Sequence, residues 1–166
     1  MSVSSTVFGY HVQYLYTLYR MIESADSKEV FVPEGREDLD IYLNDQIIET
    51  IQVKCYSGTI VYSDLFSKGK STSLFSRGKD SLAENSNVIS FVAVGHGNDK
   101  GVISDRLTKV SSLVKSLKKE ETLHLDYASS KELAAKILWQ SKSQGELENY
   151  VESVLKNRFP SIDPLI

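Results

Sequence analysis

Cysteine is nearly absent from this chain and proline is rare: its 166 residues include one cysteine, Cys55, and three prolines. A single cysteine excludes a disulfide within the chain and argues against a metal site built from cysteine ligands. The histidines give no alternative, because His11 and His124 lack the spacing of a metal-ligand pair. A metal centre of cysteine and histidine is therefore not expected.

The sequence also has no long apolar run. No segment approaches the ~20 apolar residues that a membrane-spanning helix needs. The first residues, Met1–Ser5, lack the basic start and the apolar core of a signal peptide. We therefore expect a cytoplasmic protein without contact with a membrane. The net charge of -3 argues against a surface wholly devoted to nucleic acid, although it allows a local basic patch.

The composition that remains is that of a globular protein. Hydrophobic residues make up 41% of the chain and charged residues 25%, which argues against disorder. The length suits one domain with a substantial core. We expect this domain to cover residues 1–159. Residues 160–166 are apolar and punctuated by proline, and we expect them to act as a linker into a further domain.

Two short stretches, residues 38–43 and 51–55, alternate apolar and polar side chains. Strict alternation predicts a strand with one buried face. Residues 44–46 between them, Asn-Asp-Gln, have the composition of a turn. The sequence therefore predicts a β-hairpin with these residues on its buried face: Leu39, Ile41, Leu43, Ile51, Val53 and Cys55.

The other face of this hairpin would collect two carboxylates, an amide and an ammonium group: Asp38, Asp40, Gln52 and Lys54. We predict a register in which Asp40 lies opposite Gln52 and Asp38 opposite Lys54, because apolar residues then meet apolar residues across the strands. Leu39 would then lie opposite Val53. Such a register requires a loop of odd length or a β-bulge.

The rest of the chain alternates between helix and strand patterns. A strand at 29–34 contains Pro33, which predicts an edge position, and the continuous apolar run 88–94 predicts a strand buried on both faces. We expect helices at 5–24, 65–82, 104–118, 130–139 and 144–157, and a short strand at 123–127. The predicted fold class is α/β: an α-β-β-β-α-β core, with a mixed sheet flanked by helices, followed by extra C-terminal helices.

The polar face of the hairpin has the residue types of a magnesium site. Asp40 and an oxygen near Gln52 could bind a hard divalent ion such as Mg²⁺ or Mn²⁺, which prefers oxygen ligands and retains several waters. Glu34 or Asp38 would add a second carboxylate. Lys54, beside the ion, could orient or deprotonate a water, or stabilise a charged transition state. These residue types point to metal-assisted hydrolysis of a phosphodiester.

An acidic strand followed by a Gln-x-Lys strand, with a helix before and after, resembles the PD-(D/E)XK nuclease superfamily. Glutamine replaces the usual second acid, as in Mrr-like restriction enzymes. The pattern is similar to that of nuclease domains in bacterial anti-phage effectors, both CD-NTase-associated endonucleases and domains fused to STAND-type NTPases. The residues that carry this resemblance are Gly9, Gln13, Glu34, Asp38, Asp40 and Gln52-Val53-Lys54. It covers roughly the first half of the chain.

The resemblance implies a restriction-endonuclease-like core and a Mg²⁺- or Mn²⁺-dependent endonuclease that cuts double-stranded DNA as the effector domain of an anti-phage defence protein. It implies Asp40, Gln52 and Lys54 as catalytic residues, with Asp40, Gln52 and Glu34 as metal ligands and Asp38 and Gln13 in support. It also implies a C-terminal sensor or NTPase module and a homo-oligomer in the active state. Arg36 and Glu37 interrupt the family pattern, so which carboxylate faces the metal stays open.

Two alternatives stay open from the residues themselves. Lys68, Lys70, Arg77 and Lys79 lie in a stretch without acidic residues, which is either a solvated helix face or a set of DNA contacts. We take these four as candidate DNA-binding residues. The whole domain could also be a nuclease fold without catalysis, whose charged hairpin face docks nucleic acid or a protein partner.

Overall fold

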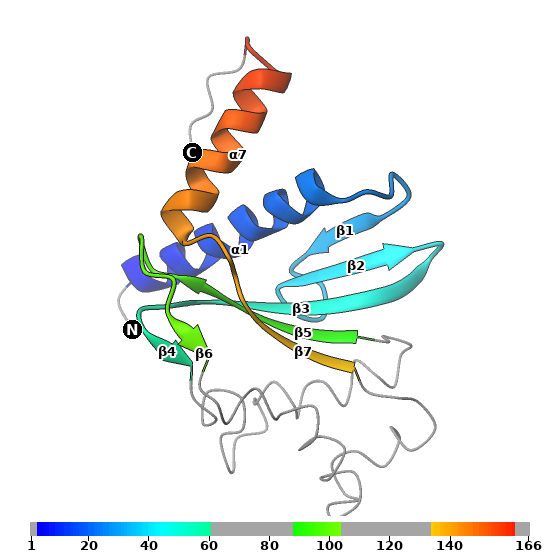
Figure 1. Cartoon of the computed structure of the whole chain (residues 1–166). Helices are drawn as coiled ribbons and strands as arrows, with labels where there is room; N and C mark the ends of the chain where they lie inside the picture. The colour runs from blue at the N-terminus through cyan, green and yellow to red at the C-terminus, as the bar shows by residue number, and fades with distance from the viewer. Residues whose placement is uncertain (1–2, 61–87, 104–133, 162–166) are drawn as a thin grey trace, which may run out of the picture.

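The computed structural model describes residues 3–60, 88–103 and 134–161. Its main sheet has five strands in the order β1-β2-β3-β5-β7 (Figure 1). Their bounds are Val30–Pro33 for β1, Leu39–Leu43 for β2, Gln46–Tyr56 for β3, Val88–Gly95 for β5 and Ala134–Trp139 for β7. The first three strands are antiparallel, and β5 and β7 continue the sheet in parallel. The fold is therefore α/β with a mixed sheet, as predicted.

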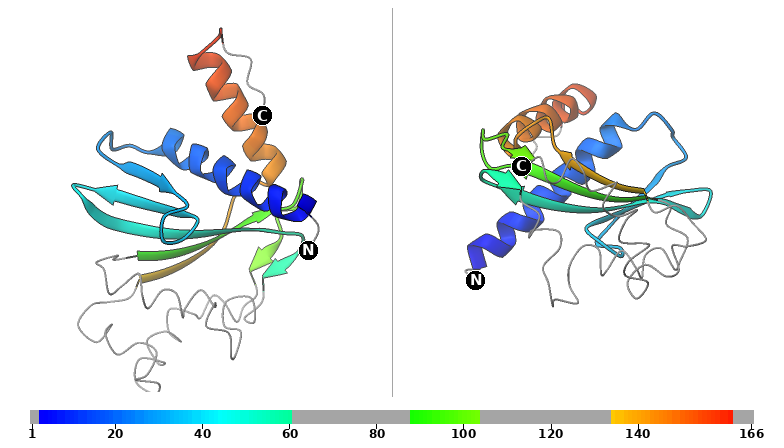
Figure 2. Two further views of the ribbon diagram at one scale, coloured as in Figure 1. Left: turned by 180° about the vertical axis from the view of Figure 1, so that it is seen from behind. Right: turned by 60° about the horizontal axis from the view of Figure 1, so that its bottom comes forward.

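One helix, α1 (Val3–Glu23), covers one face of this sheet, and a second, α7 (Gln144–Arg158), packs against α1 on the same side (Figure 1, Figure 2). Their apolar side chains meet the odd-numbered residues of β2 and β3 and the even-numbered residues of β5. The buried cluster consists of Val12, Leu15, Tyr16, Leu39, Ile41, Ile51, Val53, Val92, Val94, Leu147 and Val151. Both helices confirm the predicted helices 5–24 and 144–157. No helix within the described segments is long and apolar enough to cross a membrane.

The apolar run of β5 forms a strand that is buried on both faces. Val92 and Val94 lie in the cluster beneath the helices, and Phe91 and Ala93 on the opposite face are also at most 1% exposed. Such burial is typical of a strand inside a parallel sheet. β1 lies at the sheet edge, where its Pro33 removes no interior hydrogen bond. Both predictions are confirmed.

The hairpin of β2 and β3 forms, but its predicted register is wrong by two residues. Asp40 lies opposite Thr50 instead of Gln52, and Leu39 lies opposite Ile51 instead of Val53. A two-residue turn, in which Asn44 and Asp45 both have positive φ, closes the hairpin more tightly than an odd loop would. The register shifts at a bulge beyond Ile41, so the faces keep their polarity. The predicted bulge is therefore present.

A second prediction is wrong: the segment 130–139 contains strand β7 and not a helix through Trp139. Residues 134–139 pair in parallel with β5, for example Val92 with Leu138. Six residues are too few to establish a helical period, and the open edge of β5 supplies the hydrogen-bond partners of a strand. The predicted helices 65–82 and 104–118 and the strand 123–127 lie outside the described residues. Two short strands, β4 (Thr59–Ile60) and β6 (Val102–Ile103), form a separate pair that the sequence did not predict.

Candidate functional site

The pairing of β2 with β3 gives the sheet one apolar and one polar face near its antiparallel edge. Asp40 pairs with Thr50, and therefore shares a face with Gln52 and Lys54, two and four residues further along β3. Leu39, Ile51 and Val53 point the other way, into the cluster beneath α1. Three of the residues that the sequence singled out are thus brought to one face, in spite of the changed register.

Asp40 is a buried carboxylate, and its two oxygens differ in their hydrogen bonds. Its side chain belongs to a residue that is 1% exposed, and its Oδ2 accepts a hydrogen bond from the backbone N–H of Arg36 at 2.9 Å. Oδ1 has no hydrogen-bond partner among the residues that the structure describes. Buried polar atoms are almost always paired, since an unpaired one costs about 1–3 kcal/mol. The free oxygen of Asp40 is therefore a place where a ligand would be stabilised.

The loop between β1 and β2 holds Asp40 in this position. Glu34 adopts a left-handed conformation, with φ of 53°, and its N–H donates to the carbonyl of Asp38 at 3.1 Å. This tight turn brings Gly35 against Asp40: a Cβ atom at Gly35 would lie 2.5 Å from Oδ2. Only glycine allows such a close approach, so Gly35 and the Arg36 amide together form a cradle for one oxygen of Asp40.

Asp38 lies where β2 separates from β3. The strand pairing ends at Leu39 and Ile51, and beyond it the carboxylate Oδ2 of Asp38 accepts the N–H of Val53 at 2.7 Å. A side chain thus takes the hydrogen bond that a continued strand would have made. Asp38 belongs to the same loop that supports Asp40. The position suits a second carboxylate of an ion site.

Gln52 adds a neutral group to this face. It is 6% exposed, and its Nε2 donates to Oε2 of Glu37 at 3.4 Å. Glu37 has no role in the sequence-based site, where it only interrupts the family pattern. Strand alternation could not identify Glu37, because Glu37 belongs to the loop before β2. It also does not follow the every-second-residue spacing of Asp38 and Asp40.

The other predicted residues are exposed, lie on α1, or are outside the described residues. Lys54 and Glu34 are exposed, Lys54 towards the end of β3 and Glu34 in the loop. Gln13 lies on α1, the helix that covers the opposite, apolar face of the sheet; its Oε1 is buried and lacks a partner among the described residues. The candidate DNA contacts Lys68, Lys70, Arg77 and Lys79 are outside the described residues, and their role stays a prediction.

The donor groups that the sequence singled out on the polar face are oxygen atoms, the ligand type that a magnesium ion prefers. Within the described segments, no three residues among His, Cys, Asp and Glu are grouped so that they could hold a metal. Asp40, Asp38 and the amide of Gln52 instead offer two carboxylates and one neutral oxygen. Mg²⁺ is commonly bound by one or two carboxylates and keeps several waters for a phosphate substrate.

A second buried carboxylate, Glu49, lies on the opposite face of β3. It is 8% exposed; its Oε2 lies 3.1 Å from Nη2 of Arg20 on α1, and its Oε1 accepts a hydrogen bond from the hydroxyl of Ser90. Burial lowers the pKa of Arg20, but the charge of Glu49 and the contact with Tyr16 outweigh it, so that the pKa is raised overall. Glu49 is therefore a fully paired structural group.

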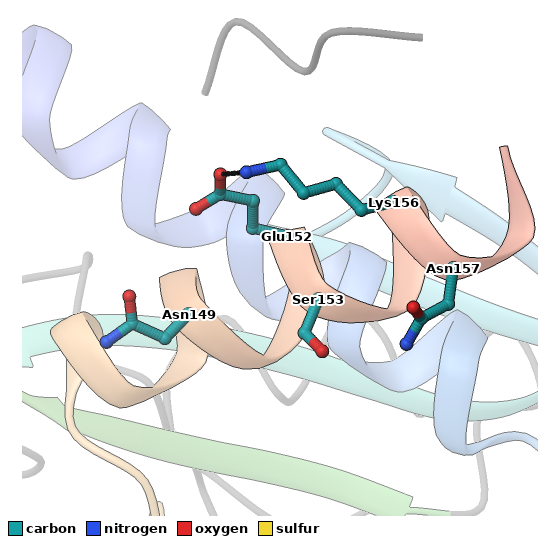
Figure 3. A pocket seen from close by; sticks show the side chains of 5 residues that line it. All are labelled: Asn149, Glu152, Ser153, Lys156 and Asn157. Carbon is teal, nitrogen blue, oxygen red and sulfur yellow. Dashed lines mark hydrogen bonds and ion pairs between the residues drawn. The ribbon is translucent and has the colours of Figure 1, made fainter. Parts of the chain in front are cut away.

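A shallow hollow of about 300 Å³ lies elsewhere, along the outer side of α7 (Figure 3). It is lined by Asn149, Glu152, Ser153, Lys156 and Asn157. Glu152 and Lys156 pair with each other across one helical turn. A hollow whose lining residues all come from one helix, and whose charges neutralise each other, has no chemistry comparable with that around Asp40.

Comparison of the chain with models of known protein families gave no match, and comparison with curated proteins gave none either. The function is therefore argued from the residues and their geometry.

Proposed function

We propose that this chain is a metal-dependent endonuclease that hydrolyses phosphodiester bonds of double-stranded DNA, with the polar face of the β2–β3 hairpin as its active site. The proposal includes a restriction-endonuclease-like core and a role as effector domain of a bacterial anti-phage defence protein. The observation that carries it is the unpaired, buried Oδ1 of Asp40, on the same face as Gln52 and Lys54.

The residues have distinct roles in this proposal. Asp40 and Asp38 hold the ion through carboxylate oxygens, and Gln52 contributes its neutral side-chain oxygen. The bound Mg²⁺ or Mn²⁺ would polarise the phosphate and activate water. Lys54 is not a ligand: its exposed ammonium group contacts the scissile phosphate and stabilises the negative charge that grows as water attacks phosphorus and the bond to the leaving sugar oxygen breaks.

The test is cleavage of supercoiled plasmid by the purified chain with Mg²⁺ or Mn²⁺, with metal binding measured separately by calorimetry. Lys54→Ala should reduce cutting by about 100-fold or more, a loss typical of one electrostatic donor, while Mn²⁺ affinity stays within about threefold of the parent because lysine is not a ligand. Glu152→Gln, a surface carboxylate remote from the hairpin, is the matched control. Parent-like cutting by Lys54→Ala would contradict its assigned role.

A second candidate function is a nuclease fold without catalysis that binds nucleic acid or a protein. One observation favours it: within the described residues, no cluster of three His, Cys, Asp or Glu is available to a metal. The same calorimetry decides between the two. Binding of duplex DNA without any measurable binding of Mn²⁺ would support the binding module and contradict the nuclease.

Activity should also depend on assembly. The net charge of -3 gives the chain little general attraction to DNA, and one Asp40–Lys54 site can cut only one strand at a time. We expect the isolated chain to cut weakly, and clustering by a C-terminal partner to raise its activity through avidity. The test is to fuse the chain to an inducible dimerisation domain and to compare plasmid cleavage by clustered and isolated copies at the same concentration of sites. Equal rates for clustered and isolated copies would contradict control by assembly.

A further inference from the structure

We infer that Glu37 is a positioning residue that fixes the orientation of the Gln52 side-chain amide. The inference deepens the proposed function, because Gln52 is the neutral ligand of the proposed site. It starts from a contact that the sequence did not predict: Nε2 of Gln52 and Oε2 of Glu37 are 3.4 Å apart. Gln52 is 6% exposed, so few waters can compete for its amide group.

An amide can present either its nitrogen or its oxygen to a neighbour, and the neighbour decides which. Glu37 as a carboxylate can only accept hydrogen bonds, so it attracts the NH₂ group of Gln52 and repels the carbonyl oxygen. Oε1 of Gln52 is consequently turned away from Glu37. It is then available as a neutral oxygen ligand on the face that also carries the unpaired Oδ1 of Asp40.

The same contact gives a physical reason for glutamine at position 52. A glutamate there would place a second carboxylate against Glu37 in a position where the present residue is almost fully buried. Like charges this close repel strongly when water is largely excluded. Glutamine keeps an oxygen donor for the ion and removes the repulsion. Glu37 and Gln52 therefore form a unit, in which the identity of one residue depends on the other.

All three proposed ligands are anchored through one side-chain atom. Asp40 is held through Oδ2 by the Arg36 amide, and Asp38 is held through Oδ2 by the Val53 amide. Gln52 is held through Nε2 by Glu37. The first two anchors are backbone groups that substitution cannot remove. Glu37 is the side-chain anchor, and mutagenesis can therefore test it directly.

The experiment is a double-mutant cycle on the whole chain, with Glu37→Gln, Gln52→Glu and the double exchange, in EDTA and without DNA. Gln52→Glu should lower the thermal midpoint of unfolding, because it leaves two adjacent carboxylates. The double exchange restores one amide and one carboxylate, and should recover most of that loss. Additive effects of the two single changes would overturn the pairing.

The orienting role needs a readout that packing alone would not change. In Glu37→Ala, the order parameter of the Gln52 side-chain Nε2, measured in EDTA, should fall. In a separate calorimetric titration, Mn²⁺ affinity should drop about 10- to 100-fold, the usual effect of removing a group that orients a ligand. Glu37→Gln, which can still accept from Nε2, should be affected less. Glu152→Gln is again the control.

The outcomes separate this inference from the proposed function. An unchanged order parameter of Gln52 in Glu37→Ala would overturn the positioning role, whatever the chain does to DNA. Coupling in the cycle together with a lowered order parameter supports that role, since both are measured without metal. If the parent chain then neither binds Mn²⁺ nor cleaves plasmid, the proposed nuclease function is refuted. The positioning role of Glu37 is not affected by that result.

Discussion

Two buried carboxylates lie on opposite faces of the same sheet, and they differ in how their oxygens are used. Glu49 lies under α1, where Arg20 and Ser90 occupy both of its oxygens. Asp40 lies on the other face and is even less exposed, yet its Oδ1 lacks a partner among the described residues. Burial alone therefore does not distinguish the two acids. The pairing of the second oxygen does.

The difference follows from what surrounds each group. Glu49 faces a helix whose Arg20 has an extended side chain that neutralises the buried charge, and removing one partner of such a pair is costly. Asp40 is held by the loop of residues 34–38, whose Arg36 amide binds Oδ2, while Oδ1 has no hydrogen-bond partner among the described residues. In the proposed function a metal ion binds this oxygen, whereas both oxygens of Glu49 are already paired.

The sharpest test exchanges the two carboxylates for amides one at a time. Asp40→Asn should abolish Mn²⁺ binding and reduce plasmid cutting at least ~100-fold, equivalent to ~2.7 kcal/mol, with the free energy of unfolding within about 1 kcal/mol of the parent. Glu49→Gln should lower the free energy of unfolding by about 1–3 kcal/mol, because Arg20 loses its charge partner, and should leave cutting per folded molecule unchanged. Urea unfolding and initial cleavage rates measure both. The comparison fails if Asp40→Asn costs more stability than Glu49→Gln.

Gly35→Ala tests the cradle of Asp40 without altering any carboxylate. A Cβ atom there would lie 2.5 Å from Oδ2 of Asp40, so the carboxylate has to move away from the Arg36 amide. We expect Mn²⁺ affinity and cutting to fall by about 10-fold or more, as when another supporting contact of a metal site is lost. Gly97→Ala, in the loop after β5, adds the strain of a positive φ and therefore gives an upper limit for the stability cost of replacing a glycine away from the site. Unchanged Mn²⁺ affinity in Gly35→Ala would show that the cradle does not hold Asp40.

The smallest expected effect concerns an exposed, paired carboxylate, Glu146, which forms the capping box of α7. The backbone N–H of Ser143, then its hydroxyl and Lys100, lower the pKa of Glu146. A lowered pKa in the folded state means a contribution to stability that is complete above the ordinary pKa of ~4.3 and is lost as pH falls through the folded value. Glu146→Gln should therefore lower the thermal midpoint of unfolding at pH 7 and differ less from the parent at pH 3. An equal difference at both pH values would contradict the capping role.

Much of the fold was predictable because its signals are local. Within one element, the pattern of apolar residues indicates which side chains are buried. This holds for the apolar stripe of α1, for the alternation in β2 and β3 and for the continuous apolar run of β5. The register of the hairpin was not predictable in the same way: a slip of two residues preserves every face, so alternation cannot distinguish Thr50 from Gln52 as the partner of Asp40. The turn conformation of Asn44 and Asp45 decides it.

The site was predictable to the extent that it lies on strands. Asp40, Gln52 and Lys54 share a face because alternate residues of a strand point to the same side. This spacing can be read from the sequence. The loop contacts of Gly35, Arg36 and Glu37 depend on a left-handed turn at Glu34, and such a turn at a glutamate has no sequence signature. The strand β7 was missed for a related reason, since its partner β5 lies about 45 residues away along the chain.

The strand order also has a consequence for the folding of the chain. Pairs within β1–β3 connect near neighbours, such as Asp40 with Thr50, whereas the parallel pairs connect Gln52 with Phe91 and Val92 with Leu138. Closing a long stretch of chain costs entropy before any contact compensates for it, so we expect the antiparallel half to be structured in the folding transition state and β7 to dock afterwards. Substitutions in β7 should then mainly accelerate unfolding, and substitutions at Leu39 or Ile51 should slow folding. The segment that carries the polar site would thus be the early part of the fold.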